Sequence, residues 1–184
     1  MTLEIVVLAI VLLMIALIFA STVMTGISPV PTSPRVHRTM MAALTGRLPG
    51  KPDAKVYELG SGWGGMAFAL ARRYPDHPVI GFEVSVLPWA FSRLRLIVQP
   101  QPNLRLNWTN FAAADLSDAG LVVCYLFPAA MQELAVKFER ELQPGALVLS
   151  NTFAIRHWRP VDELTAMDQY ASKVYLYEAG GQGS

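Results

Sequence analysis

The sequence predicts an α/β fold in which a mainly parallel β-sheet carries helices on both faces. Between Lys55 and Asn151, short apolar runs of strand length alternate with longer runs of helical periodicity, which is typical of a parallel sheet. After Asn151, two further apolar segments follow each other without a helix between them. This arrangement predicts an antiparallel hairpin at the edge of the sheet.

The elements follow one another in a regular order. We expect a first helix over residues 34–48, because Ser33 can cap it and Pro34 suits its first position. The predicted strands then cover residues 55–59, 79–83, 104–108, 121–126, 146–151, 161–167 and 173–178. The predicted helices between them cover residues 66–73, 88–98 and 129–142.

The composition limits the classes of function. The chain has 184 residues, enough for one α/β domain and a short appendage. Its formal net charge is +1, so no field of one sign indicates nucleic-acid binding. Cys124 is the only cysteine, and the histidines His37, His77 and His157 are widely spaced. We therefore expect neither a disulfide nor a metal site.

The N-terminal segment predicts a transmembrane helix. Residues 5–20 are apolar without a break, and residues 21–24 extend the run without a charge. About 20 apolar residues in a helix cross a bilayer. A signal peptide fits less well, because the start lacks a basic residue and the run is long. A buried core helix also fits less well, since a helix that is apolar on every face is rare in a small domain.

The flanking charges predict how this helix is oriented. Glu4 is the only charge before the run, whereas arginines follow soon after it. Because positive residues stay on the cytoplasmic side, we expect a single-pass membrane protein with a cytoplasmic catalytic domain. The predicted organisation is a transmembrane helix at residues 1–25 with its span at 5–24, a proline-rich linker at 26–34, and one domain at 35–184.

The most informative stretch is KVYELGSGWGG, in which a predicted strand runs through a glycine-rich turn into a helix. Such a unit brings backbone N–H groups close to a ligand. Two fingerprints fit it. Gly60, Gly62 and Gly65 satisfy the dinucleotide pattern G-x-G-x-x-G. With Glu58 and Gly64, the first two glycines also satisfy E-x-G-x-G-x-G, the loop of S-adenosyl-L-methionine (AdoMet) methyltransferases.

Two acids at strand ends favour AdoMet. Glu58 places a carboxylate where it can accept from the ammonium group of AdoMet but would repel a pyrophosphate. Glu83 ends the next strand, where a carboxylate suits the two hydroxyls of a ribose. The predicted cofactor site therefore comprises Glu58, Gly60, Ser61, Gly62 and Gly64 at the methionine end and Glu83 at the ribose.

From about residue 29 to its end, the chain resembles the small class I AdoMet-dependent protein-lysine methyltransferases of archaea and their mitochondrial relatives. The matching stretches are PVPTSPRVHRTM, YELGSGWGG, LSDAGLVVCYLFP, FERELQPGALVLSNTFAIRHWRP and VYLYEAG, together with Asn110 and Phe111. The resemblance implies a Rossmann-like sheet of seven strands with helices on both faces, AdoMet as the methyl donor and a protein lysine as the acceptor.

Two positions depart from the family pattern. The family usually has G-D-G-R in the loop, where this chain has GWGG, and it usually has Asp where this chain has Asn110. An amide can still hydrogen-bond adenine, but differently. We expect Asn110 and Phe111 to border the adenine. The resemblance also implies that Thr32 reaches over the methionyl group.

The segment after the fourth predicted strand is the candidate acceptor site. We assign Tyr125 the catalytic position, and Phe127 and Trp63 substrate binding, because apolar walls desolvate a lysine and favour its neutral form. Strand alternation implies that only one of Tyr125 and Phe127 points into the site. Cys124 is expected to be buried packing rather than a nucleophile.

These features together favour a membrane-anchored AdoMet-dependent methyltransferase that acts on a protein lysine. The predicted loops after the fourth and fifth strands carry no long insertion, which suits a large substrate. Two alternatives stay open. One is methylation of a lipid or quinone presented by the bilayer. The other, kept open by the altered loop, is a non-catalytic subunit of a membrane complex.

Overall fold

The structure is a computed structural model that describes residues 2–25, 32–47, 49–51 and 53–181; in the first helix, it describes the side chains of residues 2–9, 11, 12, 15 and 16. The helices are α1 (Thr2–Thr25), α2 (Pro34–Ala43), α3 (Gly65–Arg73), α4 (Val86–Val98), the short 3-10 helix η1 (Phe111–Ala113) and α5 (Pro128–Glu141). The strands are β1 (Lys55–Leu59), β2 (Val79–Glu83), β3 (Leu104–Trp108), β4 (Ala119–Cys124), β5 (Leu147–Asn151), β6 (Asp162–Thr165) and β7 (Lys173–Glu178).

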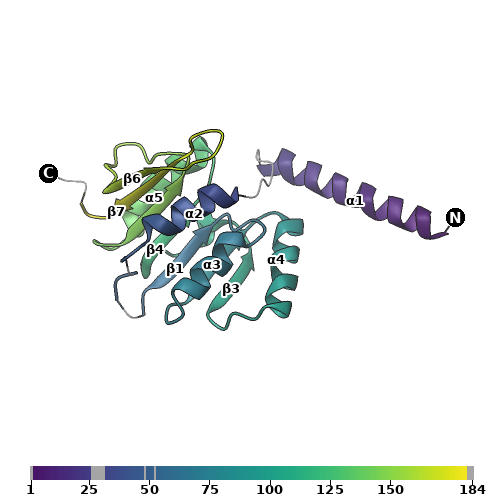
Figure 1. Cartoon of the computed structure of the whole chain (residues 1–184), viewed down its shortest axis with the longest axis horizontal. Coiled ribbons are helices and arrows are strands. Elements are labelled where there is room, and N and C mark those ends of the chain that lie inside the picture. The colour runs from purple at the N-terminus through teal and green to yellow at the C-terminus, as the bar shows by residue number, and fades with distance from the viewer. Residues whose placement is uncertain (1, 26–31, 48, 52, 182–184) are drawn as a thin grey trace.

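Seven strands form one sheet in the order β3-β2-β1-β4-β5-β7-β6 (Figure 1). Strands β1 to β5 are parallel to one another, and β7 runs antiparallel between β5 and β6. The strand order therefore reverses between β1 and β4, and open α/β sheets bind ligands at the carboxyl ends of the strands beside such a reversal. The parallel core, the seven strands and the terminal hairpin confirm the predicted fold.

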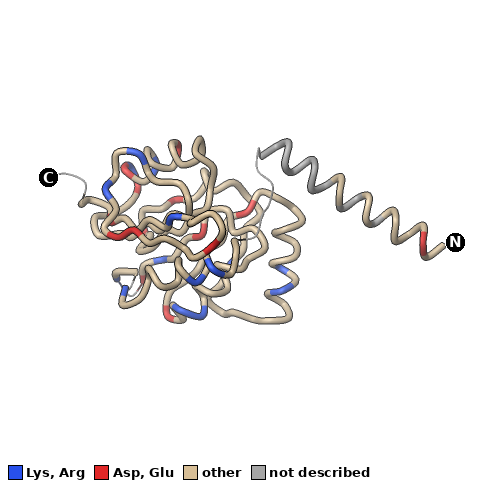
Figure 2. The backbone as a smooth tube through the Cα atoms, turned by 45° about the horizontal axis from the view of Figure 1, so that its top comes forward, with Lys and Arg blue, Asp and Glu red and all other residues tan. Residues whose placement is uncertain are grey.

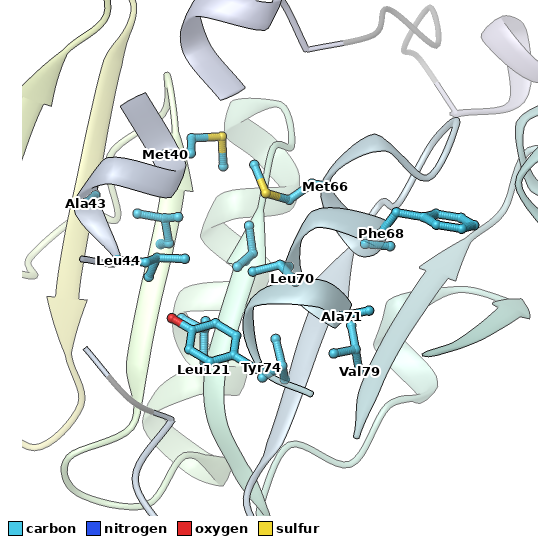
Figure 3. Close-up of a cluster of buried hydrophobic side chains, with 14 of the residues drawn as sticks. Met40, Ala43, Leu44, Met66, Phe68, Leu70, Ala71, Tyr74, Val79 and Leu121 are labelled. Carbon is cyan, nitrogen blue, oxygen red and sulfur yellow. The ribbon is translucent and has the colours of Figure 1, made fainter. Parts of the chain in front are cut away.

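The strands feed two hydrophobic cores, one on each face of the sheet. Val56 belongs to the core beneath α2, α3 and α4, whereas its neighbour Tyr57 belongs to the core beneath α5. Figure 3 shows the first core, in which Met40 of α2 and Met66 of α3 lie close together. Helices thus cover both faces, as expected, and leave the carboxyl ends of the strands open.

The helix predicted over residues 34–48 ends earlier, at Ala43. The backbone N–H of Thr45 donates to the carbonyl of Ala42 in a turn, and Gly46 then adopts a left-handed conformation with φ 71°. A residue in that conformation does not continue a right-handed helix, so the chain turns toward β1.

The strand predicted over residues 121–126 is β4, at Ala119–Cys124, and so ends two residues earlier than expected. Leu126 leaves the strand ladder and packs against Gly60. A Cβ on Gly60 would lie only 3.0 Å from the Cδ2 of Leu126. Tyr125 and Phe127 consequently belong to the loop that leads into α5. The alternation expected of a strand therefore does not apply to them.

Helix α1 forms at the predicted N-terminal position and extends away from the sheet (Figure 1). Its described apolar side chains, such as Leu3, Leu8 and Ile15, are exposed. Within the part of the chain that the structure describes, no helix is both long and apolar enough to cross a membrane. The span predicted at residues 5–24 includes side chains outside the described set, and most of the predicted linker, residues 26–31, also lies outside it.

Candidate active site

The candidate site surrounds the loop between β1 and α3. Gly60, Gly62 and Gly64 have φ of 82°, 51° and 78°, a region that residues with a Cβ rarely adopt. A Cβ on Gly64 would also lie 2.9 Å from the Cβ of Ser92. The fold therefore requires glycine in this loop, which delivers the first N–H groups of α3 to the open edge of the sheet.

Glu83 ties this loop to the end of β2. Its buried carboxylate accepts hydrogen bonds from the backbone N–H groups of Gly62 and Ser85, both at 2.7 Å. Each carboxylate oxygen has a second lone pair, so a ribose diol can still donate to it. Glu83 thus ties the loop to β2, and its role as the ribose acceptor stays a prediction.

Glu58 is buried at the end of β1, with only 6% of its surface exposed. Among the described residues, its Oε2 is the only buried side-chain nitrogen or oxygen without a hydrogen-bond partner. Burial raises the pKa of Glu58 well above its ordinary value, and the negative charge of Glu83 raises it further. A hydrogen bond from the backbone of Ala67 lowers the pKa but does not outweigh these two effects. A buried acid with an open acceptor fits a cationic ligand group. The ammonium of AdoMet is such a group, and the residues present therefore fit this cofactor.

Asn110 follows β3 and caps η1. Its Oδ1 accepts from the backbone N–H of Ala112 at 2.8 Å, and its NH₂ group adds two donors that the aspartate usual in the family lacks. A contact of Asn110 with adenine could therefore donate as well as accept. Phe111 is half-buried against the core beneath α5. The adenine role of both residues stays a prediction.

Sequence reasoning overlooked Val84. It directly follows Glu83 and is 40% exposed, and the indole N–H of Trp108 donates to its carbonyl at 2.9 Å. An exposed apolar side chain beside the ribose acid suits one face of a nucleobase. An apolar residue immediately after the acid was the signal in the sequence.

The predicted acceptor end of the site follows β4. Tyr125 and Phe127 are 40% and 36% exposed, on either side of the buried Leu126. Because Leu126 packs against Gly60, these two aromatic residues lie beside the glycine loop. The structure thus brings the predicted catalytic residue and the predicted substrate-binding Phe127 to the same edge as the cofactor loop.

The remaining predicted site residues are Trp63, Ser61 and Thr32. The ring of Trp63 meets that of Phe91 in α4 edge-on, with 5.4 Å between the ring centroids, which places Trp63 beside α4. Ser61 is buried, and its backbone N–H donates to the carbonyl of Phe82 at 2.8 Å. Thr32 is half-buried next to the α2 cap. Their roles toward substrate or cofactor stay predictions.

Cys124 is packing, as expected. Its thiol is buried beside the sulfur of Met131, and burial raises its pKa to about 12. Among the described residues, no three His, Cys, Asp or Glu side chains could together hold a metal.

A hollow of about 80 Å³, which sequence reasoning also overlooked, lies between the start of α5 and the loop after β5. Its lining residues are Pro128, Met131, Gln132, Phe153, Ala154 and Arg156.

The strand order, the strained glycine loop and the two buried acids define a class I methyltransferase with a site for AdoMet. The profile of the ANTKMT methyltransferase domain family matches residues 58–162, more than half of the chain. The chain belongs to this family and is an AdoMet-dependent methyltransferase.

Two curated relatives extend the comparison. A protein-lysine N-methyltransferase of Saccharolobus islandicus (strain REY15A) is 29% identical over 161 residues, which cover 82% of this chain and 92% of the relative. The adenine nucleotide translocase lysine N-methyltransferase of Mus musculus is also 29% identical, over 157 residues and 84% of this chain. The match spans 64% of the mouse protein.

A solved structure supports the fold. The RNA methyltransferase from Salinibacter ruber, in complex with S-adenosyl-L-homocysteine, superposes with a TM-score of 0.71. The two are 24% identical, and the match covers 84% of this chain and 97% of the other.

Proposed function

We propose that this methyltransferase transfers a methyl group from AdoMet to a lysine of a protein at a membrane, with residues 5–24 as the anchor and the domain on the cytoplasmic side. The observation that carries the proposal is the acceptor end itself, where Tyr125 and Phe127 form an exposed aromatic edge beside the glycine loop. The names of both curated relatives, which are lysine methyltransferases, support the choice of acceptor.

The protein's part in the reaction is mainly positioning. When bound, AdoMet supplies a methyl group on a sulfonium, which an amine can attack. Glu58 and the backbone of the glycine loop would hold the methionine end, and Glu83 would hold the ribose. A free lysine has a pKa near 10.4 and must lose a proton before attack. An aromatic entrance favours the neutral amine by withholding water from the charged form.

The membrane part of the proposal rests on α1. Residues 5–24 carry no charge, and the described apolar side chains of the helix are exposed. Arginines follow the run, with Arg35 and Arg38 just after the linker. A reporter fused after Ser184 should be active only if it is a cytoplasmic type. Activity of a periplasmic or lumenal reporter there would reverse the proposed orientation.

Incubating membranes that contain the enzyme with radiolabelled AdoMet tests the acceptor. Label in a protein band, lost when the band's lysines are blocked, is the expected result. Label in the lipid extract would indicate a lipid or quinone acceptor instead. No label above that of a Glu83→Ala control, despite AdoMet binding by the parent, would indicate a non-catalytic subunit.

A further inference from the structure

Helix α4 is apolar on the side that faces away from the sheet. Trp89 and Leu96 pack toward the core, as a helix on a sheet requires. The opposite side would normally be polar. Here the exposed residues of that side form one continuous arc of Val86, Ala90, Phe91, Leu94, Ile97 and Val98. An exposed apolar face of this extent marks an interaction surface.

The stretch of sequence that contains this face carries charges of one sign. Residues 84–114 contain no Asp or Glu but three arginines. Arg93 is exposed at one edge of the apolar arc, and no acid in the described part of the chain pairs with it. Figure 2 shows basic and no acidic positions along α4. An apolar face bordered by arginine is complementary to anionic lipid headgroups above an acyl layer.

The position of helix α1 indicates that the outer face of α4 contacts a bilayer. The two helices approach one another, and α1 extends from the side of the domain that α4 forms (Figure 1). The described apolar side chains of α1 are exposed, as is the outer face of α4. We infer that the outer face of α4 lies on the bilayer that α1 enters, as a second membrane contact. This inference rests on the proposed membrane attachment of residues 5–24.

The contact also positions the active site relative to the bilayer. Phe91 in the apolar arc of α4 touches Trp63 of the glycine loop, so the face that meets lipid is joined directly to the cofactor loop. A domain resting on α4 therefore holds its active site near the headgroups.

A fluorescent thiol probe on the full chain tests this inference. Leu94→Cys places the probe on the outer face of α4, and Val136→Cys places it on α5, at a similarly exposed apolar residue on the other face of the sheet. Native Cys124 is buried with a raised pKa and does not compete for the label. Both proteins are bound to vesicles of phosphatidylcholine and phosphatidylserine that contain lipids with a nitroxide on the acyl chain.

We expect the nitroxide to quench the probe at position 94 at least about twofold more than the probe at position 136. Equal quenching at the two positions, in protein that floats with the vesicles, overturns the α4 contact and leaves the α1 anchor standing. Protein that does not float overturns both. Shielding at position 94 that depends on protein concentration and not on nitroxide lipid indicates a contact between proteins, and overturns the lipid assignment.

Discussion

The predicted cofactor end and the predicted acceptor end of the site are built in different ways. At the cofactor end, buried acids meet backbone N–H groups, and Glu83 alone receives two such hydrogen bonds. At the acceptor end, Tyr125 and Phe127 are partly exposed aromatic side chains in a loop. The first end is therefore specified by charge and hydrogen bonding, and the second by shape and desolvation.

This difference separates binding from transfer. Removing a buried charge with fixed partners changes the affinity for AdoMet, because the lost interaction exists in the bound ground state. Removing an aromatic wall changes the positioning of the acceptor, which is expressed in the rate of transfer. Mutations at the two ends should consequently move different measured quantities.

The largest effect is expected from Glu83→Ala. Hydrogen bonds to a charged group contribute about 1.5–3 kcal/mol, so AdoMet affinity should fall tenfold or more as the ribose acceptor and the tie to Gly62 are lost. Calorimetric titration measures this, with NAD as a ligand that should not bind. Glu163→Ala on the exposed surface of β6 is the matched control and should bind AdoMet normally. An unchanged affinity in Glu83→Ala would remove the ribose assignment.

Tyr125→Ala should lower the rate of methyl transfer and not the affinity for AdoMet. We expect methyl transfer to fall at least tenfold, about 1.4 kcal/mol of barrier, with AdoMet affinity within a few-fold of the parent. Single-turnover kinetics with labelled AdoMet measure the transfer step. Since Phe127 is similarly exposed, Phe127→Ala shows which ring forms the entrance. Normal methylation by both variants would mean that the lysine enters elsewhere.

Glu58→Gln should show that Glu58 holds a proton in the folded protein and releases it when AdoMet binds. The raised pKa means that Glu58 in the folded protein without cofactor holds a proton that the unfolded chain has released, so the contribution of Glu58 to stability falls as pH rises above about 4.5. The glutamine variant should lack this fall and be more stable than the parent at neutral pH.

A cationic ligand favours the ionised acid, so AdoMet binding by the parent should release a proton. Calorimetry in two buffers of different ionisation enthalpy measures this release, which should disappear in Glu58→Gln together with a few-fold loss of affinity. Equal proton release in both proteins would show that Glu58 does not face the ammonium.

The smallest effect is expected at Cys124. Its thiol is buried and its pKa is about 12, so thiol reagents should leave methyl transfer within about twofold of the untreated rate at pH 8. Cys124→Ala should also keep the transfer rate, with at most a modest loss of thermal stability from the packing of Met131. Rapid inactivation that the alanine variant resists would place the thiol in the site.

Local patterns in the sequence were enough for much of the fold. Alternation of strand and helix gave the parallel core, and the absence of a helix between the last two segments gave the antiparallel edge. Glu58 and Glu83 were found because each stands at a strand end beside a glycine loop. The bounds were less predictable, because Leu126 ends β4 through a contact with the distant Gly60.

The amino-acid sequence alone specifies the order of the elements and the residues that need a special backbone conformation or a charge. The mutual arrangement of these residues depends on tertiary packing. Trp63 contacts Phe91 of α4, and Glu58 is left with an unpaired oxygen, because side chains far apart in the sequence fill or leave open the space between elements. The exposed arc of α4 belongs to the same category, since its apolar residues alone would predict a buried helix. Periodicity specifies which residues share a face of a helix, whereas packing decides which face is covered.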